Sequence, residues 1–139
     1  MSQHNRPLKF LTVKQPWASC MFLPDPLRKN IENRTWTRMW RGDILIHAGS
    51  GYAPHAMDWI RQHVPEAIAL LPERFPTGGI IGIVTLDDIV TEHASPWFIG
   101  QFGWVLSNAR PLPFTPMSGG LGLLDPPDHV LRALLGSLK

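Results

Sequence analysis

The segment KNIENRTW, residues 29–36, places two cations, one carboxylate and one indole within eight residues. In an extended chain the side chains alternate between two faces, so Glu32, Arg34 and Trp36 would lie on the same one. Arg34 then presents a planar fork of donors that suits a phosphate or a base edge. Trp36 offers a flat surface on which a nucleobase can stack, and Glu32 can accept a hydrogen bond from an exocyclic amine. The same spacing also allows a purely structural arrangement, in which Glu32 pairs with Arg34 and Trp36 packs.

The combination of a cation and an aromatic ring recurs on both sides of this segment. Lys14, Gln15 and Trp17 lie before it, and residues 38–41 add two arginines and a tryptophan after it. Three such clusters within about thirty residues exceed what packing requires, and they favour a surface that binds nucleic acid.

The basic residues are concentrated in the first third of the chain. Residues 1–41 contain eight lysines and arginines against two acids, and residues 42–139 contain five against nine. This asymmetry, within a net charge of only +2, indicates a polyanionic partner, with ordinary surface charge as the alternative.

Three further groups of residues are candidates for chemistry, each with a plainer alternative. His47 is able to act as a catalytic imidazole, although a hydrogen-bonded structural histidine is the more common role. Ser50 and Tyr52, in the loop GSGY, offer hydroxyls and backbone amides to a phosphate, or simply form a glycine turn. The glycine-rich stretch 118–122 would let a backbone approach a ligand closely, or would serve as a turn.

The histidines of the helix predicted over 54–64 do not predict a metal site. His55 and Asp58 are three residues apart and share a face, but His63 lies two helical turns away and no third ligand is apparent. We therefore expect no metal ion and no cofactor.

The positions of proline, glycine and apolar residues predict the elements that hold these groups. The pattern predicts strands over 8–13, 30–36, 42–49, 78–90 and 102–112, with the turn-like SNAR inside or near the end of the last one. Helices are expected after Pro16, over 54–64 and after Asp125, whose side chain would cap the last helix. With 44% apolar and 17% charged residues, we expect a globular protein with a single domain over residues 1–139. Short strands between a few helices, with repeated glycines, favour an α+β fold with a small bent sheet or barrel over a parallel βαβ sheet.

The composition of the chain also indicates the cellular compartment in which we expect the protein. The chain has one cysteine, Cys20, which rules out an internal disulfide and a cysteine-based zinc site. The longest apolar run, residues 80–86, is far too short to cross a bilayer, and the amino-terminal stretch lacks an apolar run of signal-sequence length. We expect a cytoplasmic monomer that does not associate with membranes.

Four blocks of the sequence, in this order, resemble an ASCH domain: LTVKQPWASCMF, KNIENRTWTRMWRGDILIHAG, FPTGGIIGIVTLDDIV and GWVLSNARPLPFTPMSGGLGLL. The resemblance covers roughly residues 8–124 and is strongest to the branch of the family found in the transcription coactivator activating signal cointegrator. It implies a PUA-like bent β-barrel of about five to six strands with flanking helices. It also implies a protein that handles RNA, DNA or modified bases.

The family motif G-x-K-x-x-E-x-R falls on Lys29, Glu32 and Arg34, with Leu27 in place of the glycine. The departure at Leu27 affects the shape of that loop and not the cleft itself. The QPWA block, residues 15–18, lies against the same cleft in members of the family.

The resemblance and the residue chemistry together predict binding of nucleic acid (RNA or single-stranded DNA, with a modified base as an option) or of a nucleotide, in a basic cleft. The residues expected to form it are Lys14, Gln15, Trp17, Lys29, Glu32, Arg34, Trp36, Arg41, Ser50 and Tyr52. The cations would hold phosphates, a tryptophan would stack on a base, and Gln15 and Glu32 would read polar edges.

Two alternatives remain open, so the sequence does not decide whether the chain is an enzyme. Some small ASCH proteins hydrolyse acetylcytidine and others are ribonucleases, which would make Lys29 the catalytic candidate. In the amidohydrolases a threonine tends to occupy the position of Glu32, and a nearby carboxylate favours the charged ammonium, the wrong form for a base or nucleophile. The other alternative is a protein-interaction module in transcription.

Overall fold

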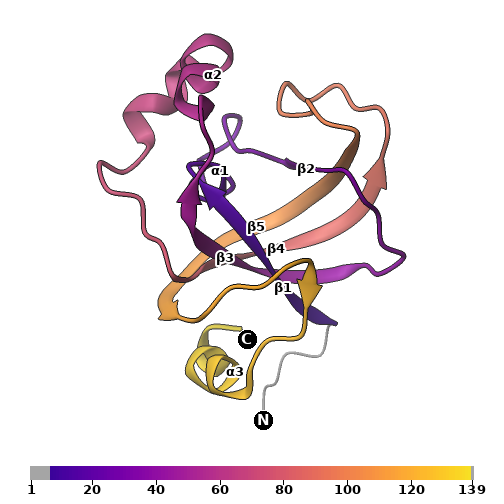
Figure 1. Ribbon diagram of the computed structural model, residues 1–139, viewed down its shortest axis with the longest axis vertical. Coiled ribbons are helices and arrows are strands. Elements are labelled where there is room, and N and C mark those ends of the chain that lie inside the picture. The colour runs from indigo at the N-terminus through magenta and orange to yellow at the C-terminus, as the bar shows by residue number, and fades with distance from the viewer. Residues whose placement is uncertain (1–6, 139) are drawn as a thin grey trace.

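Six strands form one curved sheet in the computed structural model, which describes residues 7–138 (Figure 1). The strands are β1 (Leu8–Gln15), β2 (Ile31–Arg34), β3 (Gly42–Tyr52), β4 (Gly79–Val90), β5 (Phe102–Pro116) and β6 (Leu123–Leu124). Their order in the sheet is β2-β5-β4-β3-β1-β6, in which β1 and β3 run parallel and the other neighbouring pairs run antiparallel. This mixed sheet with a few short helices confirms the predicted α+β fold class and its barrel-like sheet.

Short helices close the two ends of the barrel. They are α1 (Trp17–Cys20), α2 (Ala56–His63), η1 (Pro65–Leu70), α3 (Asp128–Leu134) and η2 (Leu135–Leu138), where η marks a 3₁₀ helix. In Figure 1, α2 lies above the sheet and α3 below it. As predicted, α2 turns its apolar stripe inward, with Ile60 and the following Val64 buried and Met57 partly buried. No helix among residues 7–138 is long and apolar enough to cross a membrane.

The start of α3 differs from the sequence prediction. Its N-cap is Pro127, and the carboxylate of Asp125 instead accepts a hydrogen bond from Lys9 Nζ at 2.7 Å. Pro127 has an extended backbone, with ψ of 151°, so the chain between Asp125 and the helix does not fold back on the first turn. The carboxylate therefore points to β1 and not to the N–H groups that it was expected to cap.

The turn-like stretch SNAR, expected inside or near the end of the strand predicted over 102–112, lies within β5, which runs unbroken from Phe102 to Pro116. Asn108 adopts a left-handed backbone, with φ of 51°, a conformation that asparagine tolerates better than most residues. The register between β4 and β5 shifts at three places along their pairing. Such irregularities bend a strand and increase its twist, so the turn-like residues curve β5 without ending it.

Three clusters of buried side chains make up the core. The barrel interior holds branched aliphatic side chains of β1, β3 and β4 together with Trp104 of β5. A second cluster seats α3 against the sheet through Val130 and its neighbours. The third cluster lies under α1, α2 and η1, where Trp17, Trp59 and Trp97 contact one another edge to face or tilted. Trp59 and Trp97 are therefore packing residues.

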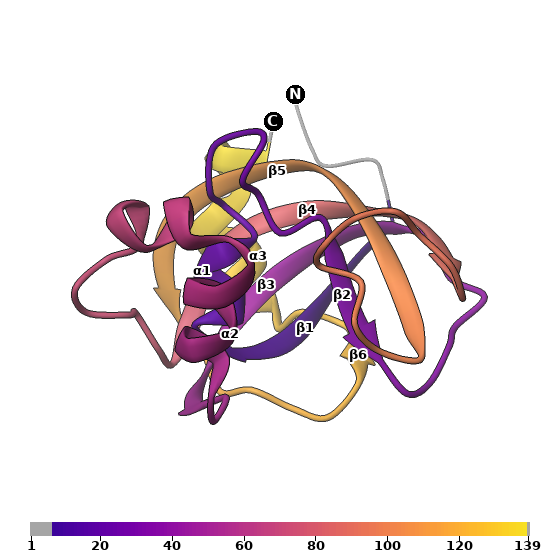
Figure 2. The ribbon, with the colours of Figure 1, turned by 90° about the horizontal axis from the view of Figure 1, so that it is seen from above.

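Seen from above, the sheet curls so that its two edge strands, β2 and β6, lie on the same side of the molecule (Figure 2), and residues of β1, β2 and the loop before β6 line a common hollow there. In the described part of the chain, β2 pairs with β5 alone, and β6 pairs with β1 at Phe10 and Leu11. A side chain bridges the remaining gap, because Nη2 of Arg34 donates to the carbonyl oxygen of Thr12 at 3.0 Å. We call this gap, between β2 on one side and β1 and β6 on the other, the seam.

Candidate functional site

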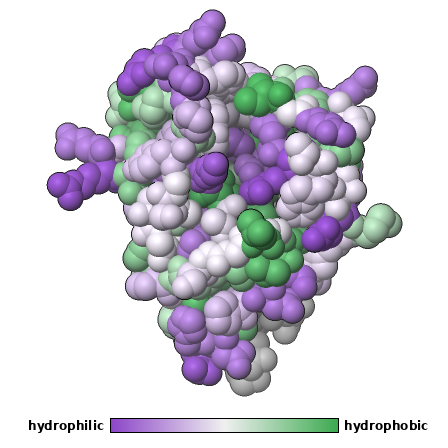
Figure 3. Space-filling model, in the orientation of Figure 1, coloured by the Kyte–Doolittle hydropathy of each residue, from purple (hydrophilic) through white to green (hydrophobic). Residues whose placement is uncertain are grey.

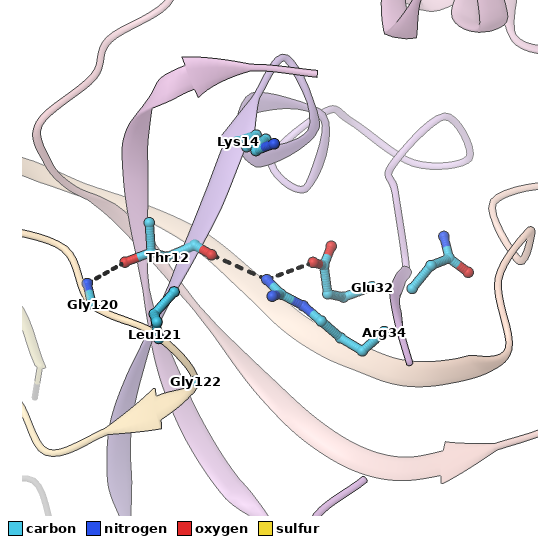
Figure 4. A pocket seen from close by; sticks show the side chains of 8 residues that line it. Thr12, Lys14, Glu32, Arg34, Gly120, Leu121 and Gly122 are labelled. Carbon is cyan, nitrogen blue, oxygen red and sulfur yellow. Dashed lines mark hydrogen bonds and ion pairs between the residues drawn. The ribbon is translucent and has the colours of Figure 1, made fainter. Parts of the chain in front are cut away.

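A hollow of about 360 Å³ lies over the seam (Figure 4). Its lining residues come from β1, β2 and the loop before β6, and are Thr12, Lys14, Glu32, Asn33, Arg34, Gly120, Leu121 and Gly122. We call it the central hollow. In the space-filling view, hydrophilic residues gather on the middle of this face of the molecule, where the surface is hollowed (Figure 3).

Glu32 and Arg34, which line the central hollow from β2, form a short chain of charges with Lys29 behind them. Lys29 Nζ lies 3.1 Å from Oε1 of Glu32, and Nη2 of Arg34 lies 2.9 Å from Oε2 of the same carboxylate. The ammonium of Lys29 also donates to the carbonyl oxygen of Ile31. Lys29 is only 3% exposed, Glu32 is buried, and the side chain of Arg34 is 22% exposed. One carboxylate thus serves two cations, and the cluster keeps one positive charge in excess.

Arg34 lines the hollow together with Glu32, and its position is fixed from several sides. Its guanidinium bonds to the Thr12 carbonyl and to Glu32, and it lies 5.9 Å from the ring centroid of Trp36. Its buried Nε has no hydrogen-bond partner among the described residues. Lys14, exposed on β1, adds a second cation to the lining. The hollow therefore combines a preorganised guanidinium with an exposed ammonium.

Trp36 lies outside the central hollow, although the sequence prediction that it shares a side with Arg34 agrees with their contact. It lines a neighbouring hollow of about 270 Å³ together with Asn33, Arg34, Thr35, Gly100 and Gln101, which we call the tryptophan hollow. The edge of Trp36 meets Trp104, with centroids 4.8 Å apart and planes at 80°. The guanidinium of Arg38 lies 4.7 Å from its ring centroid, so a base that stacked on that side would have to displace Arg38.

Three predicted site residues are turned into the protein. Gln15 is fully buried, donates to the Pro76 carbonyl at 2.8 Å and accepts from the Ser19 backbone N–H at 2.9 Å. Trp17 packs among tryptophans, and the ammonium of Lys29 lies 5.8 Å from its ring centroid. Direct ligand contact by Gln15, Trp17 and Lys29 stays a prediction, and their burial gives it no support.

Arg41 and Tyr52 lie outside the central hollow. Arg41 donates to the carbonyl oxygens of Arg38 and Trp40, and its Nη2 lies 3.3 Å from Asp88 Oδ1, so it holds the loop between β2 and β3 in place. The exposed ring of Tyr52 meets Phe75 edge to face. Neither side chain lines the central hollow.

Ser50 lines a third hollow of about 560 Å³ on the other side of the loop before β6. Its lining also includes Thr12, His47, Gly49, Gly78 and residues 117–121, and we call it the histidine hollow. His47 is 3% exposed. Its Nε2 lies 2.6 Å from the Met117 carbonyl, which can only accept, so Nε2 donates, and Nδ1 shares a hydrogen bond with the Thr12 hydroxyl at 3.2 Å. Both ring nitrogens make hydrogen bonds inside the protein. His47 therefore has the hydrogen-bonded structural role that is the more common one for a histidine.

The histidines of α2 are dispersed in the structure. His63 stacks on Trp59 with centroids 4.5 Å apart, and Asp58 pairs with Arg61 at 3.1 Å. Among residues 7–138, no group of three or more His, Cys, Asp or Glu side chains is placed to hold a metal ion.

Sequence reasoning missed two residues of the central hollow, Thr12 and Asn33. Thr12 is two residues before Lys14 on β1, and this period-two spacing is the signal that would have put both on one face. Asn33 was assigned to the face opposite Glu32. Its side chain bonds to the Trp97 carbonyl and to the Ile99 and Gly100 N–H groups, yet it still forms part of the lining.

No protein-family model and no curated protein sequence matches this chain. Its function is therefore inferred from the geometry and charge of the central hollow.

Proposed function

We propose that this chain is a PUA-like domain of the ASCH type that binds nucleic acid, or a nucleotide, in the central hollow. The observation that carries the proposal is the sharing of the buried Glu32 carboxylate by two cations. The excess positive charge lies next to the hollow that Arg34 and Lys14 line, and phosphate is the anion that a guanidinium fork suits best. The cytoplasmic location and the monomeric state expected from the sequence are part of the proposal.

The fixed position of Arg34 favours binding. Its two protein partners, the Thr12 carbonyl and Glu32, hold the guanidinium in place before any ligand arrives. An ordered side chain loses less conformational entropy on binding than a free one, so more of the phosphate interaction appears as affinity.

Groups that suit a base lie in the same hollow. The polar side chains of Glu32 and Asn33 and the apolar side chain of Leu121 line it beside the cations. A nucleotide presents one charged part and one flat part with polar edges, and this lining offers partners for both.

Hydrolysis through Lys29 finds no support in this geometry. The ammonium faces the Ile31 carbonyl and Glu32, and Lys29 does not line the central hollow. A lysine that acts as a base or nucleophile must face its substrate, whereas this ammonium is turned toward two acceptors of the protein.

Fluorescence anisotropy with a labelled single strand of about 12 nucleotides, as RNA and as DNA, tests the binding proposal. We expect binding at low salt that weakens steeply as salt rises, because phosphate contacts release counterions. Arg34→Ala should weaken binding by about 1–3 kcal/mol and reduce the salt slope by about one. Arg61→Ala removes the same charge from the exposed face of α2, and should leave both quantities unchanged.

Two results would overturn the proposal. One is the absence of binding at low salt by protein that a melting curve shows to be folded. The other is an equal loss of affinity in Arg34→Ala and Arg61→Ala, which would reduce the effect to net charge. Release of acetate from acetylcytidine, or of RNA fragments, that disappears in Lys29→Ala would establish the hydrolase in its place.

A further inference from the structure

The loop before β6 carries an apolar side chain in an unusual place. Leu121 is 95% exposed, has a glycine on each side, and lines both the central hollow and the histidine hollow. It thus lies on the boundary between two hollows that are otherwise lined largely by polar side chains and glycines (Figure 4).

The base of this loop is fixed, so the position of Leu121 is set by the fold. The backbone N–H of Gly120 donates to Thr12 Oγ1 at 3.2 Å, and the Met117 carbonyl accepts from His47 Nε2 at 2.6 Å. Gly119 packs so closely that a Cβ there would lie 2.8 Å from Thr12 Oγ1 and 2.9 Å from His47 Cε1. The role of His47 is therefore to hold the chain that presents Leu121.

The three hollows follow one another across this face of the molecule. The histidine and central hollows share Thr12, Gly120 and Leu121, and the central and tryptophan hollows share Asn33 and Arg34. Two kinds of side chain therefore stand between consecutive hollows, an apolar one at the first boundary and a cation at the second.

A single-stranded nucleic acid has the chemistry that this alternation fits. Its bases can leave their stack and enter separate hollows, whereas a duplex presents only base edges in its grooves. Apolar side chains are used by nucleic-acid-binding proteins as wedges between neighbouring bases, and a guanidinium binds the phosphate that links two nucleotides.

We propose that the three hollows take consecutive nucleotides of one extended single strand, with Leu121 inserted between the bases in the histidine and central hollows. This inference rests on the proposed function and names its ligand class. Arg34 then binds the phosphate between the central and tryptophan hollows. Leu121 is a specificity-determining residue, because it separates bases that would otherwise stack.

A fluorescent base tests the wedge directly. The fluorescence of 2-aminopurine is quenched when the base stacks between adenines in a single strand. It rises when the stacking contact with a neighbouring base is lost. We expect its fluorescence to rise when a strand containing it at every second position binds the wild type. In Leu121→Ala the rise should be at least halved, with affinity reduced about 5–150-fold, as for loss of one stacking contact.

Met39→Ala is the matched control, because Met39 is 97% exposed, lies in another loop and lines none of the three hollows. It should behave as the wild type in both readouts. Affinity should also increase from a mononucleotide to a trinucleotide, and the same sequence as a duplex should bind at least about tenfold more weakly. RNA and DNA strands are run in parallel to distinguish the two sources of this chemistry.

The outcomes separate this inference from the function beneath it. Three results, each together with binding that depends on Arg34, would overturn the inference and leave the proposed function standing. They are the absence of a fluorescence rise, a rise that Leu121→Ala leaves unchanged, and a mononucleotide that binds as tightly as the strand. Equal affinity for the duplex would do the same. If anisotropy shows no binding, both fail together.

Discussion

Glu32→Gln removes the carboxylate that Lys29 and Arg34 share while keeping its size and one acceptor oxygen. Lys29 is 3% exposed and loses the charged partner that lies 3.1 Å from its ammonium. Stranding one partner of a buried ion pair costs about 3–5 kcal/mol, of which the remaining neutral hydrogen bond recovers about 1 kcal/mol. Arg34 adds little to the cost, because it is partly exposed and keeps the Thr12 carbonyl. We therefore expect the free energy of unfolding to fall by about 2–4 kcal/mol.

This expectation differs from the one that the sequence alone supports. With Lys29 placed at the cleft surface, water would solvate its ammonium and Glu32→Gln would affect stability only mildly. Because Lys29 is buried, its ammonium is not solvated in this way. Glu32→Gln should therefore lower the free energy of unfolding more than the loss of an exposed ion pair would.

Urea denaturation followed by tryptophan fluorescence measures the effect. A double-mutant cycle with Lys29→Met separates the cost of the stranded charge from the cost of lost packing. The double variant has no buried ammonium, so its loss of stability should be smaller than the sum of the two single losses by about 1–3 kcal/mol. Asp58→Asn, in the exposed pair with Arg61, is the control and should change stability by less than about 0.5 kcal/mol. A Glu32→Gln loss no larger than this control, or a cycle that is additive, would refute the reasoning.

Three further substitutions or conditions test the packing around the site. Gly119→Ala should lower the free energy of unfolding by about 1–3 kcal/mol, because the added Cβ would lie 2.8 Å from a threonine hydroxyl. In the same urea assay Gly136→Ala, whose Cβ would meet nothing within 4 Å, should stay within about 0.5 kcal/mol of the wild type, and similar losses in the two variants would contradict the close packing of the loop. Burial raises the pKa of the Cys20 thiol from 9.0 to about 12, against a smaller opposite effect of Lys29. The unfolded thiol therefore loses its proton first, so stability should decrease as the pH rises from about 9 toward 12, and a thiol reagent should label the native protein only as it unfolds. Labelling at the rate of the unfolded chain would show that Cys20 is accessible. Thr85→Val removes a hydroxyl that donates at 2.8 Å to a buried carboxylate of β3, and should lower stability by about 1.5–3 kcal/mol in a thermal melt, whereas an unchanged melt would mean that another donor replaces it.

Elements defined by a local pattern were predictable from the sequence. The apolar runs bounded by glycine became β3 and β4, and the amphipathic spacing of residues 54–64 became α2. The alternation in β2 correctly brought Glu32 and Arg34 together. At SNAR the local preference for a turn lost to the long pairing of β5 with β4, which a reading of neighbouring residues does not contain.

The parts of the site that depend on distant contacts were not predictable. Lysine is rarely buried, so Lys29 was expected at the surface, and its burial depends on a carboxylate and an indole that the fold brings around it. The bond from Arg34 to the Thr12 carbonyl joins residues 22 positions apart, on β2 and β1, which are the first and the fifth strand in the sheet order. The loop that carries Leu121 reaches the hollow only because β6 pairs with β1.

The closure of the seam by Arg34 has a consequence for how the barrel moves. A ladder of backbone hydrogen bonds fixes two strands at one spacing, whereas a guanidinium on a long side chain keeps its bond over a range of strand separations. The circumference of this barrel is therefore adjustable at one place, between β1 and β2, without loss of any strand pairing. Backbone amides along that gap should exchange their hydrogens sooner than those of β3 and β4 in the interior of the sheet. The site thus lies at the place where a side chain, and not a ladder of backbone hydrogen bonds, closes the barrel.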